Sequence, residues 1–319
     1  MDFSVVIPLF NKGPHVAATV RSALAQTLAP REVLVVDDGS TDDGPEQVGV
    51  IADPRVKLLF RSPPGPGGYA ARNHGVRHAR GEWVAFLDAD DIWLPHHLAD
   101  MAEAVAACAE PVGCAFTRYE VKQAGRDQLN PIAEDILTPG RALNLETVVR
   151  AWLKTQRCPI WTGACAFRRS LLVDVGLFPD GRARRGGDKD LWLRATARAK
   201  SAFAPRVSAE FHQDTVNRVT TSTAHTELPV IAGTIRDLLP AASPAERKLL
   251  RALSNQEIAL YARHAAGAGT RVDARFLRAL YLPEGLREAA AIMALSLTGP
   301  LIGPARVKWR ARRDAGASL

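Results

Sequence analysis

The sequence predicts an α/β protein with a mostly parallel sheet flanked by helices. Two short apolar segments, 3–8 and 32–36, have the composition of buried strands, and residues 14–28 between them carry apolar side chains at helical spacing. A strand, a helix and a strand joined by short loops form a unit with parallel strands. The apolar run 83–87 is a further buried strand, as expected for a sheet covered on both faces.

Later segments extend this pattern into two predicted domains. The further strands are expected at 56–60, 113–121, 164–167, 202–204 and 207–211, and the further helices at 70–80, 94–110, 146–156 and 170–176. Residues 121–145 have the composition of an insertion loop, and after about residue 225 the pattern is helical through 290. We therefore expect a catalytic domain over 1–225 and a helical extension over 226–319.

Acidic residues follow the strand 83–87 directly. Asp88 and Asp90 are two positions apart, so an extended chain directs both carboxylates to one side. Paired carboxylates suit a hard divalent cation, and such a cation suits a diphosphate. The simpler alternative is an acidic turn in which Asp91 caps a helix near Ile92.

A second acidic turn follows the strand 32–36, with Asp37 and Asp38 at its start. If both strands belong to one parallel sheet, the two turns lie on the same carboxyl edge, where open α/β sheets bind their ligands. Helix capping alone explains one acidic turn better than it explains two, so the pair favours a ligand site.

Five segments in order resemble the family 2 glycosyltransferases of the GT-A fold. They are VIPLFNK at 6–12, VDDGSTD at 36–42, AARNHG at 70–75, FLDADD at 86–91 and GGDKDLWLR at 186–194. The resemblance extends roughly over residues 3–220. One position departs from the family pattern, because Gly187 stands where the family has Glu.

The resemblance implies a site for a nucleotide-sugar donor. Asp90 would be the primary ligand of Mg²⁺ or Mn²⁺, with Asp88 contacting the metal or the ribose. Asp38 would accept a hydrogen bond from the base, on which Phe10 would stack. Pro8 belongs to the same donor-binding segment.

The remaining implied roles concern the phosphates and the acceptor. Arg72 would clamp a phosphate or orient Asp38. Asp188 would be the general base of a single displacement with inversion, and Asp190 a residue of the helix start or a second acceptor-side acid. The weaker candidates are Trp161, as an acceptor platform that could equally be a core residue, and His212, as a metal ligand that could equally be structural.

These features predict an inverting, metal-dependent glycosyltransferase. Its donor would be a nucleotide-diphosphate sugar, by preference a UDP-sugar. Its acceptor would be a glycan or a lipid-linked molecule in cell-surface polysaccharide synthesis.

Other functions would need features that differ from those of this sequence. A sugar-phosphate nucleotidyltransferase would need a glycine-rich phosphate loop at 9–13, where the chain reads LFNKG. A non-catalytic nucleotide-sugar-binding module would be expected to lack both Asp90 and Asp188, and both are present. A hydride-transfer enzyme would need a GxGxxG motif after the first strand, which is absent.

The charge distribution bears on partners. The net charge is +7, yet no zinc finger, RNP-type aromatic cluster or basic heptad region indicates nucleic-acid binding. Basic residues gather at 182–185 and 306–313, the latter after the apolar segment 289–304. That tail could pack as a helix, lie on an anionic membrane surface or span a bilayer. With four cysteines outside any metal or CxxC spacing and no recognisable leader, we expect a cytoplasmic protein, peripheral on the inner face of the cytoplasmic membrane.

Overall fold

The computed structural model describes residues 1–64, 68–183, 185–215 and 227–296. The chain divides into two compact units, Met1–Arg218 and Val219–Leu319. The expected domain boundary after residue 225 lies within 216–226, outside the described residues, and stays a prediction.

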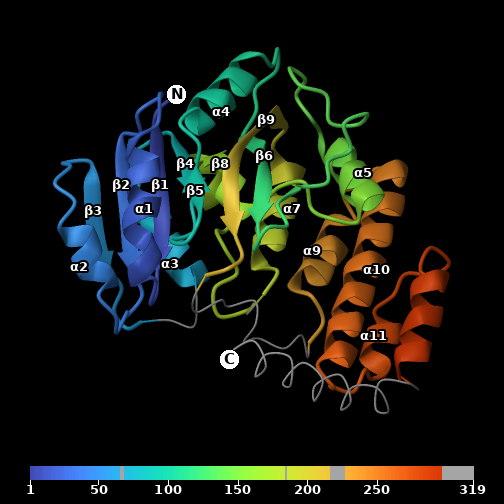
Figure 1. The fold of residues 1–319 in the computed structure, drawn as a ribbon. Helices are drawn as coiled ribbons and strands as arrows, with labels where there is room; N and C mark the ends of the chain where they lie inside the picture. The colour runs from blue at the N-terminus through green and yellow to red at the C-terminus, as the bar shows by residue number, and fades with distance from the viewer. Residues whose placement is uncertain (65–67, 184, 216–226, 297–319) are drawn as a thin grey trace. The chain divides into compact units, whose positions relative to one another are not determined.

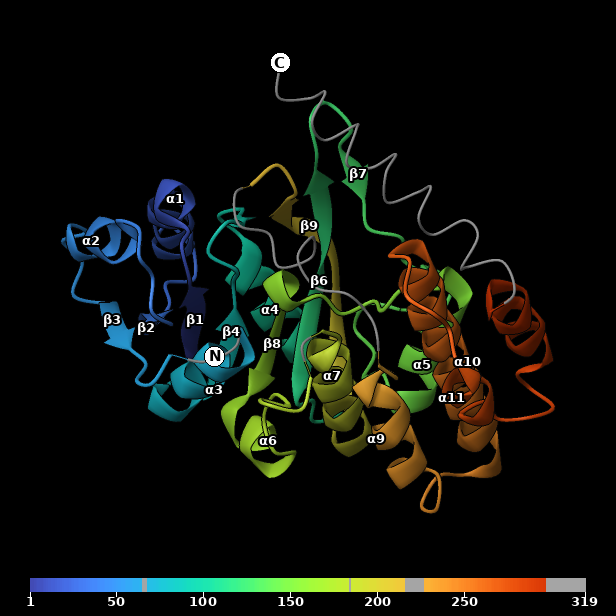
Figure 2. The same ribbon diagram turned by 90° about the horizontal axis from the view of Figure 1, so that it is seen from below.

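The first half of unit one is a parallel sheet covered by helices. Its strands are β1 (Phe3–Leu9), β2 (Glu32–Asp37), β3 (Val56–Phe60) and β4 (Trp83–Phe86), which lie in the order β3-β2-β1-β4. The helices between them are α1 (Gly13–Leu24), α2 (Gly44–Gly49) and α3 (Gly68–His78). Figure 2 shows α1 and α2 on one face of these strands and α3 on the other. The predicted α/β fold is confirmed.

The second half continues the same sheet with mixed pairing. Its strands are β5 (Ile92–Trp93), β6 (Cys114–Lys122), β7 (Gln128–Leu129), β8 (Cys165–Arg168) and β9 (Ser201–His212). β8 pairs antiparallel with both β4 and β6, whereas β6 and β9 are parallel. The helices are α4 (His97–Ala106), α5 (Leu145–Thr155), the short 3₁₀ helix η1 (Thr162–Ala164), α6 (Arg169–Asp174) and α7 (Gly187–Arg198). The strands of both halves form one sheet across unit one (Figure 1).

Three details differ from the sequence expectations. The two strands expected at 202–204 and 207–211 form one strand, β9. Its pairing with β6 is irregular where Thr117 and Arg118 face Ala204 and Val207. Pro205 lies in this bulge, as proline in a strand often does. The alternative in which Asp91 caps a helix near Ile92 is wrong, because Ile92–Trp93 pairs with β9 and α4 begins only at His97. The insertion loop contains β7, which pairs with the end of β6.

Alternation along β1 separates two cores. Val5 and Ile7 belong to the apolar cluster under α1 and α4, and Val6 belongs to the cluster under α3, α5 and α7. Gly75 of α3 lies so close to the sheet that a Cβ there would stand 2.4 Å from the Val6 side chain. This close approach holds α3, and with it Arg72, against the carboxyl edge of β1 and β4.

Unit two is helical over its described residues. It contains α9 (Val230–Leu238), α10 (Pro244–Gly267) and α11 (Ala274–Arg278), and residues 286–296 are also helical. A capping box between Ser243 and Glu246 begins α10. Among the described residues no helix is long and apolar enough to span a bilayer. The predicted basic cluster at 306–313 lies outside the described residues.

Candidate active site

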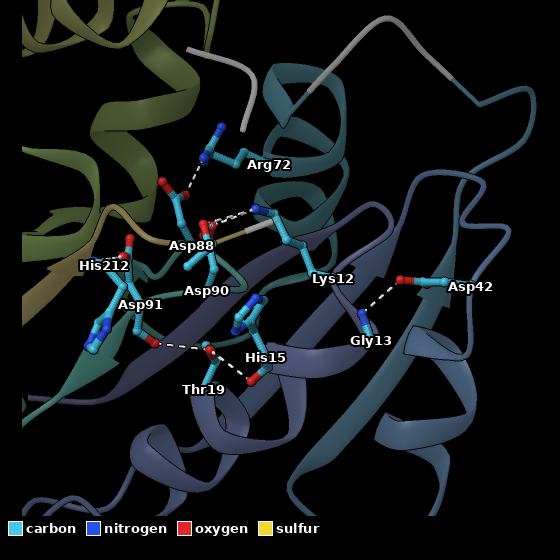
Figure 3. Close-up of polar contacts among 11 residues, drawn as sticks. Lys12, Gly13, His15, Thr19, Asp42, Arg72, Asp88, Asp90, Asp91 and His212 are labelled. Atoms are coloured by element: carbon cyan, nitrogen blue, oxygen red, sulfur yellow. Dashed lines mark hydrogen bonds and ion pairs between the residues drawn. The ribbon is translucent and has the colours of Figure 1, made fainter. Parts of the chain in front are cut away.

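The turn after β4 brings two carboxylates beside two cations (Figure 3). Lys12 Nζ lies 2.5 Å from Asp90 Oδ2, and the Thr215 hydroxyl donates to the same oxygen over 2.6 Å. Arg72, from α3, donates to Asp88 Oδ1. The carboxylates that were expected to meet a metal and a diphosphate are therefore paired with two cations of the chain itself.

Arg72 is nearly as buried as Lys12, with 11% of its side chain exposed against 12%. Its burial acts to lower the pKa of the guanidinium, but the neighbouring charges of Asp88, Tyr69 and Asp188 outweigh this and raise the pKa above its ordinary value. The guanidinium also lies over the Phe178 ring, 5.7 Å from its centre. Arg72 thus stays charged, with Asp88 in the turn after β4 as its ion-pair partner and Asp188 of α7 contributing to the raised pKa. Of its two expected roles, orienting Asp38 is not what the structure shows, because Arg72 pairs with Asp88.

Asp91 ties the turn together. Its side chain is 1% exposed, and its Oδ1 accepts a hydrogen bond from the His212 backbone N–H over 2.8 Å. Its backbone carbonyl accepts one from the Thr19 hydroxyl over 2.9 Å. Burial first, and then the charges of Asp88 and Asp90, raise the pKa of Asp91 well above its ordinary value. Asp91 joins the turn to α1 and β9 rather than capping a helix.

The residues expected to bind the nucleotide lie at the carboxyl ends of β1 and β2. Asp38 is buried, and Arg61 Nε donates to its Oδ1 over 2.6 Å. Burial raises the pKa of Asp38, against the opposing effect of Arg61. Phe10 is 54% exposed, which excludes a core role and leaves its ring available for stacking. Pro8 is half-buried opposite Val36 in the last part of β1.

The loop that carries Phe10 is held in place by neighbouring side chains. Asn11 has a positive φ of 50°, a conformation that asparagine tolerates. Its side-chain oxygen accepts from the Thr41 N–H over 2.7 Å, and its own N–H donates to the Ser40 hydroxyl over 3.0 Å. Asp42 accepts from the Gly13 N–H over 2.8 Å at the start of α1. The loops after β1 and β2 therefore form one connected rim.

The two acids of α7 have different environments. Asp188 is half-buried in the first turn, whereas Asp190 is 1% exposed and bonds Arg194 over 2.7 Å. Arg194 also donates to the backbone carbonyls of Val175 and Leu177. Asp190 holds Arg194, which fastens α7 to the preceding segment, and Asp188 is the more exposed of the two acids.

Tyr69 accounts for the glycine at position 187. The Gly187 N–H donates to the Tyr69 hydroxyl over 2.8 Å, and a Cβ on Gly187 would lie 2.8 Å from both the Tyr69 ring and Pro179. The Tyr69 ring, stacked on Phe178 with centroids 5.6 Å apart, fills the space beside the start of α7. A glutamate does not fit here without displacing Tyr69.

Trp161 lies in an aromatic group at the second half of the sheet. Its ring centre is 4.5 Å from that of Tyr119 and 4.9 Å from that of Phe211, and the ring covers Gly163, whose added Cβ would stand 2.3 Å away. Trp161 is half-buried, so one part of the ring supports packing and another part reaches the surface.

His212 pairs with a carboxylate of its own strand, and its expected role as a metal ligand stays a prediction. Its Nε2 pairs with Glu210 over 3.1 Å, while its backbone holds Asp91. A cavity of about 320 Å³ lies beside Asp90 and His212 and is also lined by His15, Lys122 and Asp214. The imidazole therefore lines the space next to Asp90 while it pairs with another carboxylate.

The carboxylates fit a hard divalent cation only in part. Within the described ranges, no three His, Cys, Asp or Glu side chains converge on one point as a metal cage. Mg²⁺ and similar ions are commonly held by one or two carboxylates together with substrate phosphate oxygens. Asp90 and Asp88 can supply that protein share, and the remaining ligands would come from a diphosphate.

Four polar residues of the site had no role assigned from sequence. Lys12, Arg61, Tyr69 and Thr215 each contact a residue that the sequence did single out. A signal existed for two of them: Lys12 and Arg61 come just after the ends of β1 and β3, so parallel topology brings them to the same edge.

Comparison with known proteins identifies the family. The model of the family described as Glycosyl transferase family 2 matches residues 4–176. The chain belongs to glycosyltransferase family 2. Among curated relatives, the succinoglycan biosynthesis protein ExoO of Rhizobium meliloti is 41% identical over 112 residues, 35% of this chain and 32% of that protein. WfgD of Escherichia coli, a UDP-Glc:alpha-D-GlcNAc-diphosphoundecaprenol beta-1,3-glucosyltransferase, is 39% identical over 95 residues, 30% of this chain and 37% of that protein.

These matches span only about a third of the curated relatives' lengths. Solved structures extend the likeness in fold. The crystal structure of S. aureus TarS in complex with UDP-GlcNAc has a TM-score of 0.72 at 16% identity and covers 94% of this chain and 90% of that one. A Pyrobaculum calidifontis mannosyltransferase in complex with GDP-Man and Mn²⁺ has a TM-score of 0.51 at 22% identity and covers 93% of this chain and 86% of that one. The GT-A fold expected from sequence is confirmed.

Proposed function

We propose that this protein is an inverting, metal-dependent glycosyltransferase. It transfers a sugar from a UDP-sugar to a hydroxyl group of a glycan or lipid-linked acceptor in cell-surface polysaccharide synthesis. The observation that carries the proposal is Arg72, whose charge is held by Asp88 on the donor side and is influenced by Asp188 on the acceptor side. The implied diphosphate residue Asp88 pairs with Arg72, and the implied base Asp188 contributes to the raised pKa of the same guanidinium.

The donor proposal rests on Asp38 and Phe10. A buried carboxylate at the end of β2 can accept the imide N–H of uracil, and an exposed ring two residues after Pro8 can stack on the base. Uridine donors appear in the name of WfgD and in the TarS complex, which supports the same choice here. Adenine has no imide N–H and would lose this hydrogen bond to Asp38, so discrimination against adenine nucleotides would follow from it.

The leaving diphosphate is managed by charge. A Mg²⁺ or Mn²⁺ bound at Asp90 and Asp88 would neutralise the developing charge on the diphosphate. The Mn²⁺ complex of the Pyrobaculum calidifontis mannosyltransferase supports this choice. Arg72 and Lys12 flank the same place and supply the chain's own positive charge.

The transfer itself needs one base. Asp188 accepts the proton of the acceptor hydroxyl as that oxygen bonds to the anomeric carbon of the donor. The bond from this carbon to the diphosphate oxygen breaks, and its electron pair leaves with UDP. A base on the face opposite the leaving group gives inversion at the anomeric carbon. Asp190 positions α7 through Arg194 and takes no part in the proton transfer.

The acceptor would rest on Trp161. A sugar ring stacks on an aromatic face, and Tyr119 and Phe211 hold that face in a fixed orientation. The lipid-linked acceptor in the name of WfgD supports an acceptor presented at a membrane. The apolar and basic tail at 289–313 would bring the enzyme to the anionic inner surface of the cytoplasmic membrane.

A donor screen tests the proposed function. Hydrolysis of UDP-, GDP- and ADP-sugars by the full-length protein would be measured with Mn²⁺, with Mg²⁺ and with EDTA, followed by the same screen with lipid extracts as acceptors. We expect a UDP-sugar to be consumed only with a divalent cation, and faster with an acceptor extract. Equal rates in EDTA would contradict the metal part, and preferential use of a GDP- or ADP-sugar would contradict the uridine pocket.

Flotation with liposomes tests the membrane part separately. Full-length protein should float with anionic vesicles at low salt, and truncation after Glu284 should abolish flotation while donor hydrolysis continues. Protein that stays at the bottom at every anionic content would overturn the membrane proposal and leave the catalytic one standing.

A further inference from the structure

Lys12 is fixed at the start of α1. Its backbone carbonyl accepts hydrogen bonds from the His15 and Val16 N–H groups over 2.9 and 3.0 Å, which anchors the residue at the first turn. Its side chain is 12% exposed and reaches across the edge of the sheet to Asp90. The backbone is rigid here, while the four side-chain methylenes leave the ammonium able to swing.

The Lys12 ammonium forms an ion pair with Asp90, the carboxylate that is proposed as the main metal ligand. Lys12 Nζ and the Thr215 hydroxyl both meet Oδ2 of Asp90, at 2.5 and 2.6 Å. The second carboxylate of the turn, Asp88, is taken by Arg72. In this state each acid has a cationic partner, which agrees with the absence of a preformed metal cage among the described residues.

Charge balance indicates what releases Lys12. Each of the two ion pairs is neutral, so a divalent cation alone would add two positive charges beside Lys12 and Arg72. A nucleotide-sugar diphosphate carries two negative charges, and with the cation it restores the balance. The diphosphate also offers oxygens to an ammonium, which is a common phosphate ligand in proteins.

We propose that Lys12 holds Asp90 until the donor binds and then moves its ammonium to the donor diphosphate, which frees Asp90 for the divalent cation. This inference rests on the proposed function, since it assigns Lys12 to the same metal and diphosphate site. Lys12 is a donor-binding residue that couples two ligands: the cation binds weakly without the nucleotide, and the nucleotide binds weakly without the cation. The coupling is reciprocal, as any linkage between two binding equilibria must be.

The test compares Lys12→Met, Lys12→Arg and the wild type in two binding measurements. Mn²⁺ affinity without nucleotide is followed by the loss of the free-ion EPR signal, and UDP affinity by calorimetry with Mn²⁺ and with EDTA. In Lys12→Met, Mn²⁺ alone should bind about tenfold tighter and UDP with Mn²⁺ about tenfold weaker, the size expected for one charged hydrogen bond. Lys12→Arg should restore most of the UDP affinity.

Lys154→Met is the matched control. Lys154 forms an exposed pair with Asp135 over 2.5 Å on the surface of unit one, and its loss should change neither affinity. If the wild type needs Mn²⁺ to bind UDP and Lys12→Met leaves both affinities unchanged, the role of Lys12 is overturned and the metal part of the proposed function still stands. A wild type that binds UDP equally in Mn²⁺ and in EDTA would instead contradict the metal part of the proposed function.

Discussion

The proposed donor half of the sheet edge, at the ends of β1, β2 and β4, and the proposed acceptor half, at the start of α7, are built differently. In the donor half, Asp38 and Asp88 each come just after a strand of a parallel sheet, and parallel pairing alone brings them to one edge. In the acceptor half, Asp188 depends on Tyr69, whose hydroxyl holds the start of α7 from 118 residues away. Binding chemistry is thus encoded in local strand ends, whereas the proposed base depends on long-range packing.

The most severe way to break the donor half is to remove the charge of Asp90. Asp90→Asn should lose at least about 10³-fold in turnover, because a metal anchor contributes several kcal/mol to leaving-group stabilisation. UDP binding in Mn²⁺, measured by calorimetry, should fall with it. Asp43→Asn is the control for the loss of one negative charge. Asp43 is exposed, and its side chain accepts a hydrogen bond from Gln47 on the neighbouring turn of α2. Near wild-type turnover of Asp90→Asn in chelator would refute the metal assignment.

The acceptor half should fail in the opposite manner. Asp188→Asn should lose at least about 10²-fold in turnover, the usual size of general-base catalysis, with UDP affinity unchanged. Asp190→Asn should keep more activity but lower the free energy of unfolding by about 1–3 kcal/mol, because Arg194 loses a buried charged partner. Steady-state kinetics and thermal melting distinguish the two variants. The reverse ranking in turnover would move the base to Asp190.

Particular residues show where sequence reasoning succeeds. The parallel half, the acidic turns and the helix that carries Arg72 follow from apolar periodicity and from the order of the elements. Periodicity cannot reveal a two-residue strand such as Ile92–Trp93, which exists only because β9 is there to pair with it. The role of Asp91 was missed for the same reason.

Side-chain partners were harder to predict than positions. The sequence predicts that Asp38 lies at the carboxyl edge of the sheet, and the structure agrees. The sequence does not show which cation at that edge pairs with it, and the structure shows that this cation is Arg61. Lys12 lies in a segment that the resemblance identifies, but the sequence assigns it no role. A long lysine side chain can reach several acids, so the sequence alone does not show that its partner is Asp90. The contrast at Asp188 and Asp190 depends on burial, which neighbouring residues in the sequence cannot reveal.

A milder change sharpens the nucleotide end of the donor half. Asp38→Ala should raise the Michaelis constant for a UDP-sugar by an amount equivalent to about 1–3 kcal/mol, since one buried hydrogen bond is lost and Arg61 is left without this partner. Inhibition by UDP, GDP and ADP should be compared in the wild type and in this variant. The wild type should prefer UDP, and the variant should prefer it less. Equal inhibition of the wild type by the three nucleotides would argue against a pyrimidine pocket.

The smallest effect concerns the pH dependence of stability at Asp91. Its pKa is raised in the fold, mainly by burial, above the value of 3.8 expected when unfolded. Between these two values the native state binds more protons, so the free energy of unfolding falls as pH rises through that window. Asp91→Asn carries no such proton. Its melting temperature relative to the wild type should therefore increase from about pH 4 to about pH 8 in EDTA. A pH-independent difference would show that Asp91 is charged in the fold.

The anomeric configuration of the product tests the central claim most directly. Once a donor and an acceptor are found, NMR of the initial product of the wild-type enzyme gives the configuration of the new bond. Single displacement assisted by Asp188 predicts a bond of opposite configuration to that in the donor. A product that retains the donor configuration would contradict the proposed division of the sheet edge into a donor half that binds and an acceptor half that supplies the base.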